Sequence, residues 1–366
     1  MTATLKRTPL YPTHVALKGR LVPFAGWELP IQFSSILAEA RAVRSGAGVF
    51  DVSHMGRLYL SGPDTLALLE WVCSNQVATL RVGRARYTLL CNEGGGIIDD
   101  GIFYRLADDR FLLVCNAANR DAVVAWLRRW MGERFPAGEL EDHTEATAMV
   151  ALQGPDALAI ADALSTQPPS VLRPFAWTET VTAGAPAFVG RTGYTGEDGV
   201  EFVVRAEDAP GLWDALVERG ATPCGLGARD VLRLEAALPL HGSDIDPATT
   251  PLEAGLERFV KLEAGGFCGH DALAEQQRAG LRRRLAGFVV QDRAIPRHGY
   301  PILVDGTPAG TVTSGTWSPT LERSIGMGYV PPQAAVPGTR LQVVARGTPV
   351  EVQVVSLPFY ARKRSA

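Results

Sequence analysis

Several common functional signatures are missing from this sequence of 366 residues. It has no G-x-x-x-x-G-K-[ST] loop and no G-x-G-x-x-G after a predicted strand, so the usual cradles for nucleotide phosphates are excluded. It also lacks the G-x-S-x-G turn of serine hydrolases and the H-E-x-x-H motif of zinc proteases. No apolar run approaches the length needed to cross a bilayer, so we expect no membrane segment.

The cysteine content and the net charge further limit the classes of protein to which this chain can belong. The five cysteines are widely spaced and form no C-x-x-C pair, which predicts reduced, mostly buried thiols in a cytoplasmic protein. Cys268-Gly269-His270 lacks a second pair of ligands, so we expect no metal site. The formal net charge of -3 gives no overall basic field, which argues against nucleic acid as a partner. No apolar run follows the early basic residues, so we expect no secretory signal.

An internal repeat is the main sign of domain organisation. Gly62-Pro63-Asp64 and Gly154-Pro155-Asp156 each follow a strand-like segment and open a run with apolar residues at helical spacing. Each copy continues with two more strand-like segments and a second helical run. This order predicts two related α+β subdomains, one after the other.

The sequence changes character after about residue 278. Short alternating runs such as PILVDG, AGTVTSG and VEVQVVS follow one another, separated by glycine and proline turns. Asp305-Gly306 is a strong hairpin signal. This end predicts a small all-β barrel or sandwich, within the usual size of a domain.

One glycine-rich segment ends in two acids. Residues 91–100 contain the run Gly94–Gly96 and close on Asp99 and Asp100. Glycine lets a ligand approach the backbone closely, and on an extended chain the two acids face opposite ways, so one of them can point into a pocket. The alternative is a hairpin turn with two solvated acids.

Two other segments combine glycine with charge. Residues 191–201 place Tyr194 between glycines, as in a loop around a flat ligand, and Glu201 inside a strand-like run. The alternative for Glu201 is an exposed strand position. Residues 225–235 open a helix with Arg229 in its first turn, where the helix dipole favours anions, so Arg229 makes more sense as the partner of a carboxylate. The alternative is a surface ion pair of little energetic value.

His54 also allows two interpretations. It has the chemistry of a general base, but no nucleophile stands next to it in the segment Phe50–Gly56. A structural role is the more common one for a lone histidine in such a segment.

Together these segments resemble the aminomethyltransferase, or T-protein, family of the glycine cleavage system. The matching stretches keep the family's order and spacing from end to end. They are RTPLYPTH, FAGWELPIQF, GVFDVSHMG, NEGGGIIDDGIFYR, LQGP, RTGYTGEDGVEF, CGLGARDVLRLEA and TSGTWSPTL. One stretch departs from the family, because Ala237–His241 stands where many members carry a tyrosine. We therefore assign no pocket contact to that stretch.

The resemblance implies an α+β fold class with three domains in a cloverleaf around a central pocket. Two related α+β domains interleave along the chain, in place of the simple tandem order, and the third is the small β-barrel. We expect residues 1–56 and 140–227 in the first domain, 57–139 and 228–277 in the second, and 278–366 in the C-terminal barrel.

The resemblance also implies a site. Asp100 would be the catalytic carboxylate, and Glu201 would hold the pterin ring of tetrahydrofolate. Arg229 would bind the carboxylates of the folate tail or orient the pocket. Further residues would line the pocket or, for the last of them, reach the glutamate tail: Tyr194, Asn116, Met55, Tyr87 and Arg364.

The implied reaction belongs to glycine catabolism. A methylene group passes from an aminomethylated lipoyl arm, carried by the H-protein partner, to the co-substrate tetrahydrofolate, with release of ammonia and without a metal. An acidic partner would suit the cluster Arg282–Arg284.

Two alternatives share the fold. One is a non-catalytic folate-binding protein of iron–sulfur cluster assembly, which carries a Lys-Gly-Cys-Tyr signature where this chain has Arg191–Tyr194. The other is the folate-dependent domain of a demethylating dehydrogenase, whose dinucleotide fingerprint is absent here.

Overall fold

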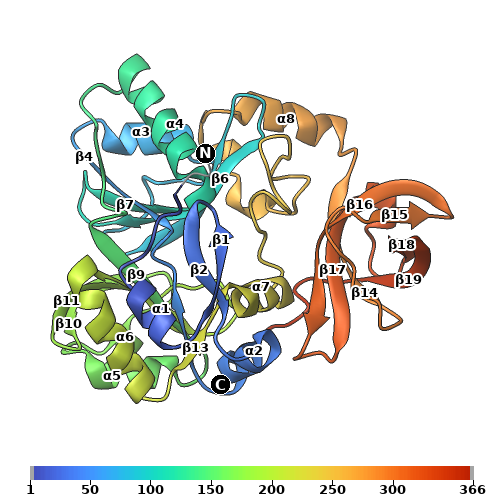
Figure 1. Ribbon diagram of the computed structural model, residues 1–366. Helices are drawn as coiled ribbons and strands as arrows, with labels where there is room; N and C mark the ends of the chain where they lie inside the picture. The colour runs from blue at the N-terminus through green and yellow to red at the C-terminus, as the bar shows by residue number, and fades with distance from the viewer. Residues whose placement is uncertain (1–3, 363–366) are drawn as a thin grey trace. The chain divides into compact units, whose positions relative to one another are not determined.

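The computed structural model describes residues 4–362 (Figure 1). The chain forms two compact units, each built from three separate stretches. The first unit takes residues 1–70, 76–88 and 100–230, and the second takes 71–75, 89–99 and 231–366. The boundaries expected for three domains stay a prediction. None of the helices in residues 4–362 has the length and apolar composition needed to cross a membrane.

A six-stranded sheet forms one half of the first unit. Its strand order is β10-β11-β12-β9-β3-β13. The bounds are β3 Gly48–Asp51, β9 Thr147–Gln153, β10 Trp177–Thr182, β11 Ala185–Gly190, β12 Gly199–Arg205 and β13 Thr222–Cys224. Helices α5 (Ala157–Leu164) and α6 (Ala209–Glu218) pack on this sheet, because the apolar side chains of both elements share one core. That core includes Val150, Phe202 and the fully buried Trp213.

A five-stranded sheet has the order β5-β6-β7-β4-β8. The bounds are β4 Gly56–Ser61, β5 Ala85–Cys91, β6 Ile97–Arg105, β7 Phe111–Cys115 and β8 Glu139–Asp142. The associated helices are α3 (Thr65–Val72) and α4 (Arg120–Glu133). The buried residues of α4 are Val123, Leu127 and Trp130, which recur at the three- and four-residue spacing of one helix face.

The predicted repeat is confirmed by the strand order. The elements β4-α3-β5-β6-β7-α4 recur as β9-α5-β10-β11-β12-α6, with one strand more in each copy than the sequence predicted, and the neighbours β5-β6-β7-β4 recur as β10-β11-β12-β9. The six-stranded sheet also takes in β3, which precedes the first copy in the chain, and β13, which follows the second. The simple tandem order is therefore wrong, because strands from outside the copies complete the second sheet.

Shorter elements complete the first unit and lead out of it. They are α1 (Tyr11–Ala16), the hairpin of β1 (Arg20–Phe24) and β2 (Trp27–Gln32), α2 (Ile36–Ser45) and α7 (Leu226–Glu235).

The second unit contains helix α8 (His270–Ala279) and a closed barrel of order β14-β17-β16-β15-β18-β19. The barrel strands are β14 Arg284–Val290, β15 Pro301–Val304, β16 Thr307–Ser318, β17 Arg323–Val330, β18 Arg340–Ala345 and β19 Thr348–Val355, drawn in orange to red in Figure 1. Phe288, Ile302 and Val312 are fully buried inside it. Asp305 and Gly306 join β15 to β16 with φ of +50° and +76°, so the hairpin turn is confirmed. The predicted α+β class with a C-terminal barrel is likewise confirmed.

The two glycines that open the repeats make the same tight turn. Gly62 has φ +102° and Gly154 has φ +130°. A Cβ atom would lie 2.3 Å from the carbonyl oxygen of Ala137 at the first position and 2.3 Å from that of Gly46 at the second. Backbone atoms cannot move aside cheaply, so glycine is required at both turns.

We expect Gly154→Ala to lower the free energy of unfolding by about 2 kcal/mol or more, because it adds a backbone clash to an unfavourable φ. Urea denaturation followed by circular dichroism measures this. Gly211→Ala is the control, since Gly211 lies in α6 and its Cβ would meet nothing within 4 Å. Equal stabilities for the two variants would contradict the steric explanation.

Candidate active site

Asp100 is a buried carboxylate held by two side chains. Only 9% of it is exposed. The hydroxyl of Tyr87 donates to Oδ2 over 2.9 Å, and Nδ2 of Asn116 donates to Oδ1 over 2.8 Å and to the backbone oxygen of Asp100 over 3.0 Å. Asp99 is fully buried as well. The alternative of a turn with two solvated acids is therefore wrong.

The sheet register explains why these residues meet. Cys115, the last residue of β7, pairs with Gly101 of β6 on one side and with Gly56, the first residue of β4, on the other. The neighbouring positions Asp100, Asn116 and Met55 therefore lie at one edge of the five-stranded sheet. Of the residues that the resemblance named as lining the pocket, Tyr87 and Asn116 contact Asp100 directly, and Met55 lies beside Asn116 on the far side of β7.

The segment that carries Met55 is held at its start by Asp51. Oδ2 of Asp51 accepts from the Thr8 hydroxyl over 2.6 Å and lies 2.7 Å from Nε2 of His14, and Oδ1 accepts from the backbone N–H of Ser53. Burial raises the pKa of Asp51, but the bond with His14 and the other donors outweigh burial and hold the pKa at about 2. Asp51 is therefore a structural anchor.

Arg57 holds the other end of the segment. Its side chain is fully buried and donates to the carbonyl oxygens of Ser53, Met55, Thr144 and Thr147. Burial lowers the pKa of Arg57 to about 10, so the guanidinium stays charged at neutral pH. A planar group with five donors suits this cluster of carbonyls better than a lysine would. The backbone around Met55 is thereby fixed.

His54 lies between these anchors and is neutral. Burial, and then the charge of Arg229, lower its pKa to about 3. Its ring contacts Phe24 edge-on, with centroids 5.6 Å apart. A histidine with so low a pKa accepts a proton poorly at neutral pH, which favours the structural interpretation over the general base.

Glu201 is a second buried carboxylate, on β12, with 8% exposed. Oε2 accepts from the Thr192 hydroxyl over 2.5 Å, and Oγ1 of Thr192 lies 2.7 Å from the hydroxyl of Tyr104. Among the described residues, Oε1 of Glu201 accepts no hydrogen bond. Burial raises the pKa of Glu201, against the opposing effects of Thr192 and Arg229. The exposed strand position is therefore wrong for Glu201.

Arg229 stands near Glu201 without a direct ion pair between the two in the described part of the chain. Its guanidinium lies 4.7 Å from the ring centroid of Tyr194, a cation–π contact. Burial lowers the pKa of Arg229, and the charge of Glu201 acts in the opposite direction. Glu39 is fully buried at the N-terminus of α7, the helix that carries Arg229. Its Oε2 accepts from the backbone N–H of Gly225 over 2.9 Å. The charge of Arg229 thus acts on Glu201 and on the ring of Tyr194.

Two hydrogen bonds, through Thr192, connect Glu201 to Tyr104 on the sheet that carries Asp100. Tyr104 lies on β6, four residues after Asp100, so the two side chains project from the same face of that strand, about 13 Å apart along it. The sequence did not single out Thr192 or Tyr104. Thr192 stands inside the quoted RTGYTG stretch, whereas no local pattern marks Tyr104, because its partner is 88 residues away.

Two glycines of these loops, Gly193 and Gly96, pack closely against other parts of the chain. A Cβ at Gly193 would lie 1.9 Å from Oε1 of Gln153, and one at Gly96 would lie 1.9 Å from the carbonyl oxygen of Pro247. The loop of residues 191–199 thus closes on the amide of Gln153, which donates to Thr192 O and accepts from Thr195. These contacts alone require glycine at both positions, and the approach of a ligand to the two loops stays a prediction.

The remaining expectations have these outcomes. Arg364 lies outside the described residues. Nε2 of His241 lies 3.0 Å from the carbonyl oxygen of Ile97. All five cysteines are free and buried, as predicted. Within residues 4–362 no group of three or more His, Cys, Asp or Glu side chains could hold a metal ion.

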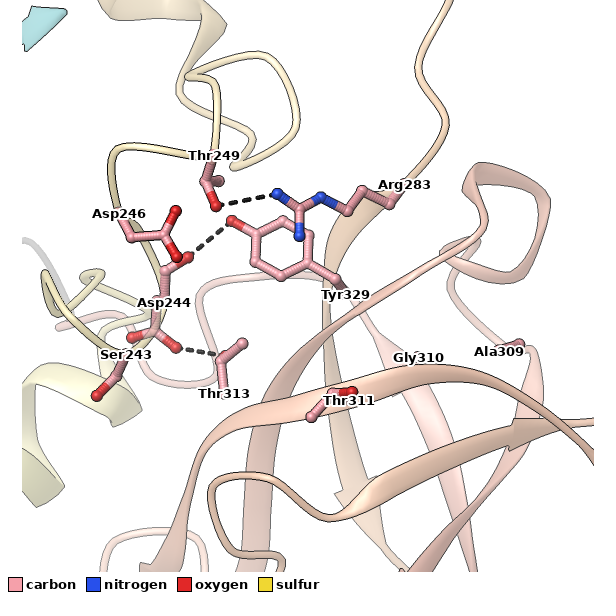
Figure 2. Close-up of a pocket in the computed structure, with 10 residues that line it drawn as sticks. All are labelled: Ser243, Asp244, Asp246, Thr249, Arg283, Ala309, Gly310, Thr311, Thr313 and Tyr329. Carbon is pink, nitrogen blue, oxygen red and sulfur yellow. Dashed lines mark hydrogen bonds between the residues drawn. The ribbon is translucent and has the colours of Figure 1, made fainter. Parts of the chain in front are cut away.

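A cavity of about 260 Å³ lies in the second unit and is lined by none of the predicted site residues (Figure 2). Its charged groups are engaged with their neighbours. Asp244 accepts from Arg233 over 2.6 Å and from Thr313 over 2.5 Å, and the Tyr329 hydroxyl donates to its backbone oxygen. Arg283 donates to Thr249 and pairs with Glu253. These bonds fasten the segment of residues 243–249 to the barrel.

Two family models match the chain. The GCVT N-terminal domain matches residues 10–264, and the Glycine cleavage T-protein C-terminal barrel domain matches residues 283–361. The chain belongs to the glycine cleavage T-protein family.

Relatives of this T-protein agree over almost the whole length. The aminomethyltransferase of Symbiobacterium thermophilum is 48% identical, over 98% of each chain. That of Rubrobacter xylanophilus is also 48% identical, over 99% of this chain and 96% of the other. The crystal structure of glycine cleavage system aminomethyltransferase T from Bartonella henselae has a TM-score of 0.91 and 37% identity, covering 97% of this chain and 98% of that one. The iron–sulfur assembly protein and the demethylase domain are therefore not favoured.

We expect the contribution of Asp51 to the stability of this T-protein to vanish in acid. Its folded pKa, about 2, lies below its ordinary value of 3.8, so the stabilisation is complete above about pH 4 and is lost as the pH falls toward 2. The difference in unfolding free energy between wild type and Asp51→Asn should therefore shrink by about 2 kcal/mol over this range.

Chemical denaturation at several pH values measures this difference. Asp109→Asn, at an exposed turn, is the control and should track the wild type at every pH. A difference between wild type and Asp51→Asn that stays constant with pH would show that the pKa of Asp51 is not lowered by folding.

Proposed function

We propose that this T-protein transfers the one-carbon unit of an aminomethyl group, carried on the lipoyl arm of an H-protein, to tetrahydrofolate, with release of ammonia. The observation that carries the proposal is the pair of buried carboxylates, Asp100 and Glu201, in a chain that matches the family over residues 10–264 and 283–361. Each has donors that fix its position, and Glu201 keeps one oxygen without a partner among the described residues.

Glu201 fits the recognition of a pterin. The ring edge of a pterin presents neighbouring N–H donors, and an ionised carboxylate is an acceptor with two oxygens. Because Glu201 is buried, such a bond forms away from competing water, where it is stronger. Tyr194 supplies an aromatic face beside it, and Arg229 orients the pocket by its stacking on Tyr194 and its charge.

Asp100 fits the catalytic role. Transfer of the methylene group builds positive charge and releases a proton, and a nearby carboxylate stabilises the charge and accepts the proton. Tyr87 and Asn116 each donate to one oxygen of Asp100, so they aim the carboxylate. Met55 lines the same edge of the sheet.

The finer assignments belong to this proposal. The H-protein is the partner, and its docking surface stays a prediction. Within Arg282–Arg284, Arg283 and Arg284 already pair with Glu253 and Glu257, so Arg282 is the most exposed charge of that cluster. The contact of Arg364 with the folate tail and the cytoplasmic location stay predictions. Free, buried thiols are in keeping with that location.

The direct test is release of ammonia. The purified protein is incubated with aminomethylated H-protein and tetrahydrofolate, and ammonia and 5,10-methylenetetrahydrofolate are measured together. We expect both products in equal amounts, and neither product when unmodified H-protein replaces the aminomethylated form. Absence of both with the complete mixture would contradict the proposed function.

We expect Asp100→Asn to lower turnover by about 100-fold or more, because the amide removes the charge and the proton acceptor. The dissociation constant for tetrahydrofolate should stay within a few-fold of the wild-type value. Asp109→Asn, which removes the same charge at an exposed turn, should leave both quantities unchanged. Full turnover in Asp100→Asn would remove Asp100 from the catalytic role.

A further inference from the structure

The carboxylate of Glu201 ends a chain of hydrogen bonds that runs from Tyr104 on the five-stranded sheet to the six-stranded sheet. Tyr104 on β6, Thr192 after β11 and Glu201 on β12 are exposed by 1%, 7% and 8%. The direction of the protons follows from chemistry. An ionised carboxylate only accepts, so Thr192 donates to Glu201, and its oxygen is then free to accept from Tyr104.

The surroundings fix the start of this chain. A Cβ at Gly190 would lie 2.8 Å from the ring of Tyr104, so that ring packs directly on the glycine backbone. Phe188 meets the same ring edge-on, with centroids 5.1 Å apart. Gly190 is also the residue that pairs with Glu201 across β11 and β12. Strand β11, which packs against the ring of Tyr104, is thus also the strand that pairs with β12 at Glu201.

We propose that Tyr104 and Thr192 are positioning residues, which hold Oε2 of Glu201 so that Oε1 is presented to a heteroaromatic ring bearing adjacent N–H donors. This rests on the proposed function, in which that ring is the pterin of tetrahydrofolate. Neither residue touches the substrate in this scheme. A carboxylate fixed by Thr192 loses less rotamer freedom when the ligand binds, so the pair contributes to affinity.

The charges around Glu201 should make the role of Thr192 measurable in the pH dependence of ligand affinity. The titratable groups that face it are Tyr104 from β6 and Arg229 from α7, and its cross-strand neighbours Gly190 and Ala151 are uncharged. Burial raises the pKa of Glu201, and the bond from Thr192 opposes this rise. Loss of that hydroxyl therefore raises the pKa of Glu201 further. As the pH is lowered, the variant should lose ligand affinity at a higher pH than the wild type does.

The experiment compares Thr192→Val, which removes the hydroxyl and keeps the shape, with Thr192→Ser, which keeps the hydroxyl. The dissociation constant for tetrahydrofolate is measured by titration from about pH 5.5 to 8.5. We expect Thr192→Val to bind about ten-fold more weakly at neutral pH and its acid limb to move to higher pH. Thr192→Ser should restore most of the affinity and the wild-type limb, and Tyr104→Phe should fall between the two.

Two further variants separate the possible outcomes. Glu201→Gln should weaken binding and abolish the acid limb, while Thr307→Val, at the exposed first residue of β16, should behave as wild type. Equal affinities and equal limbs for Thr192→Val and Thr192→Ser would overturn the proposal, as would a loss in Thr192→Val that is uniform with pH. If Thr192→Val does not fold, an unchanged acid limb and affinity in Tyr104→Phe would overturn it.

A wild-type protein that releases ammonia alongside a negative Thr192 result would leave the proposed function standing. A wild type that releases no ammonia and binds no tetrahydrofolate would remove both.

Discussion

A buried carboxylate needs hydrogen-bond donors, and the buried acids of the first unit receive them from several elements. Glu39 accepts from the backbone N–H groups of Phe33, Ser34 and Gly225, and thereby joins the β1–β2 hairpin to the start of α7. Glu201 differs from such an anchor, because a single hydroxyl holds it and one oxygen is left over. Both oxygens of Glu39 are thus engaged within the protein, whereas Glu201 keeps one acceptor for a ligand.

The duplicated architecture places Asp100 and Glu201 on corresponding sheets of the two copies. Each copy places four neighbouring strands in the same order, and each sheet carries one of the two acids assigned to the site. The link between the sheets is polar and specific, since it runs through the hydroxyls of Tyr104 and Thr192. A buried hydroxyl without a partner costs free energy, so this link also favours one arrangement of the two sheets within the unit.

Four glycines of the quoted motifs are required by contacts within the protein. Gly62 and Gly154 are required by positive φ and by a neighbouring carbonyl, while Gly96 and Gly193 make room for Pro247 and for Gln153. Close approach is the common factor in all four, as glycine chemistry predicts. The approaching group is part of the protein in each case, and only coordinates reveal which group it is.

The sequence by itself determined the elements, the repeat, the barrel and the family, because strand and helix periodicities, turn residues and long matching stretches are local. It also marked Asp100, Glu201 and Arg229, through the resemblance and not through their spacing. Only the tertiary structure decided that both acids are buried, that Asn116 and Tyr87 aim Asp100, and that Tyr104 reaches Thr192. These bonds join residues from 13 to 88 positions apart, and such pairings depend on strand register, which no local pattern encodes.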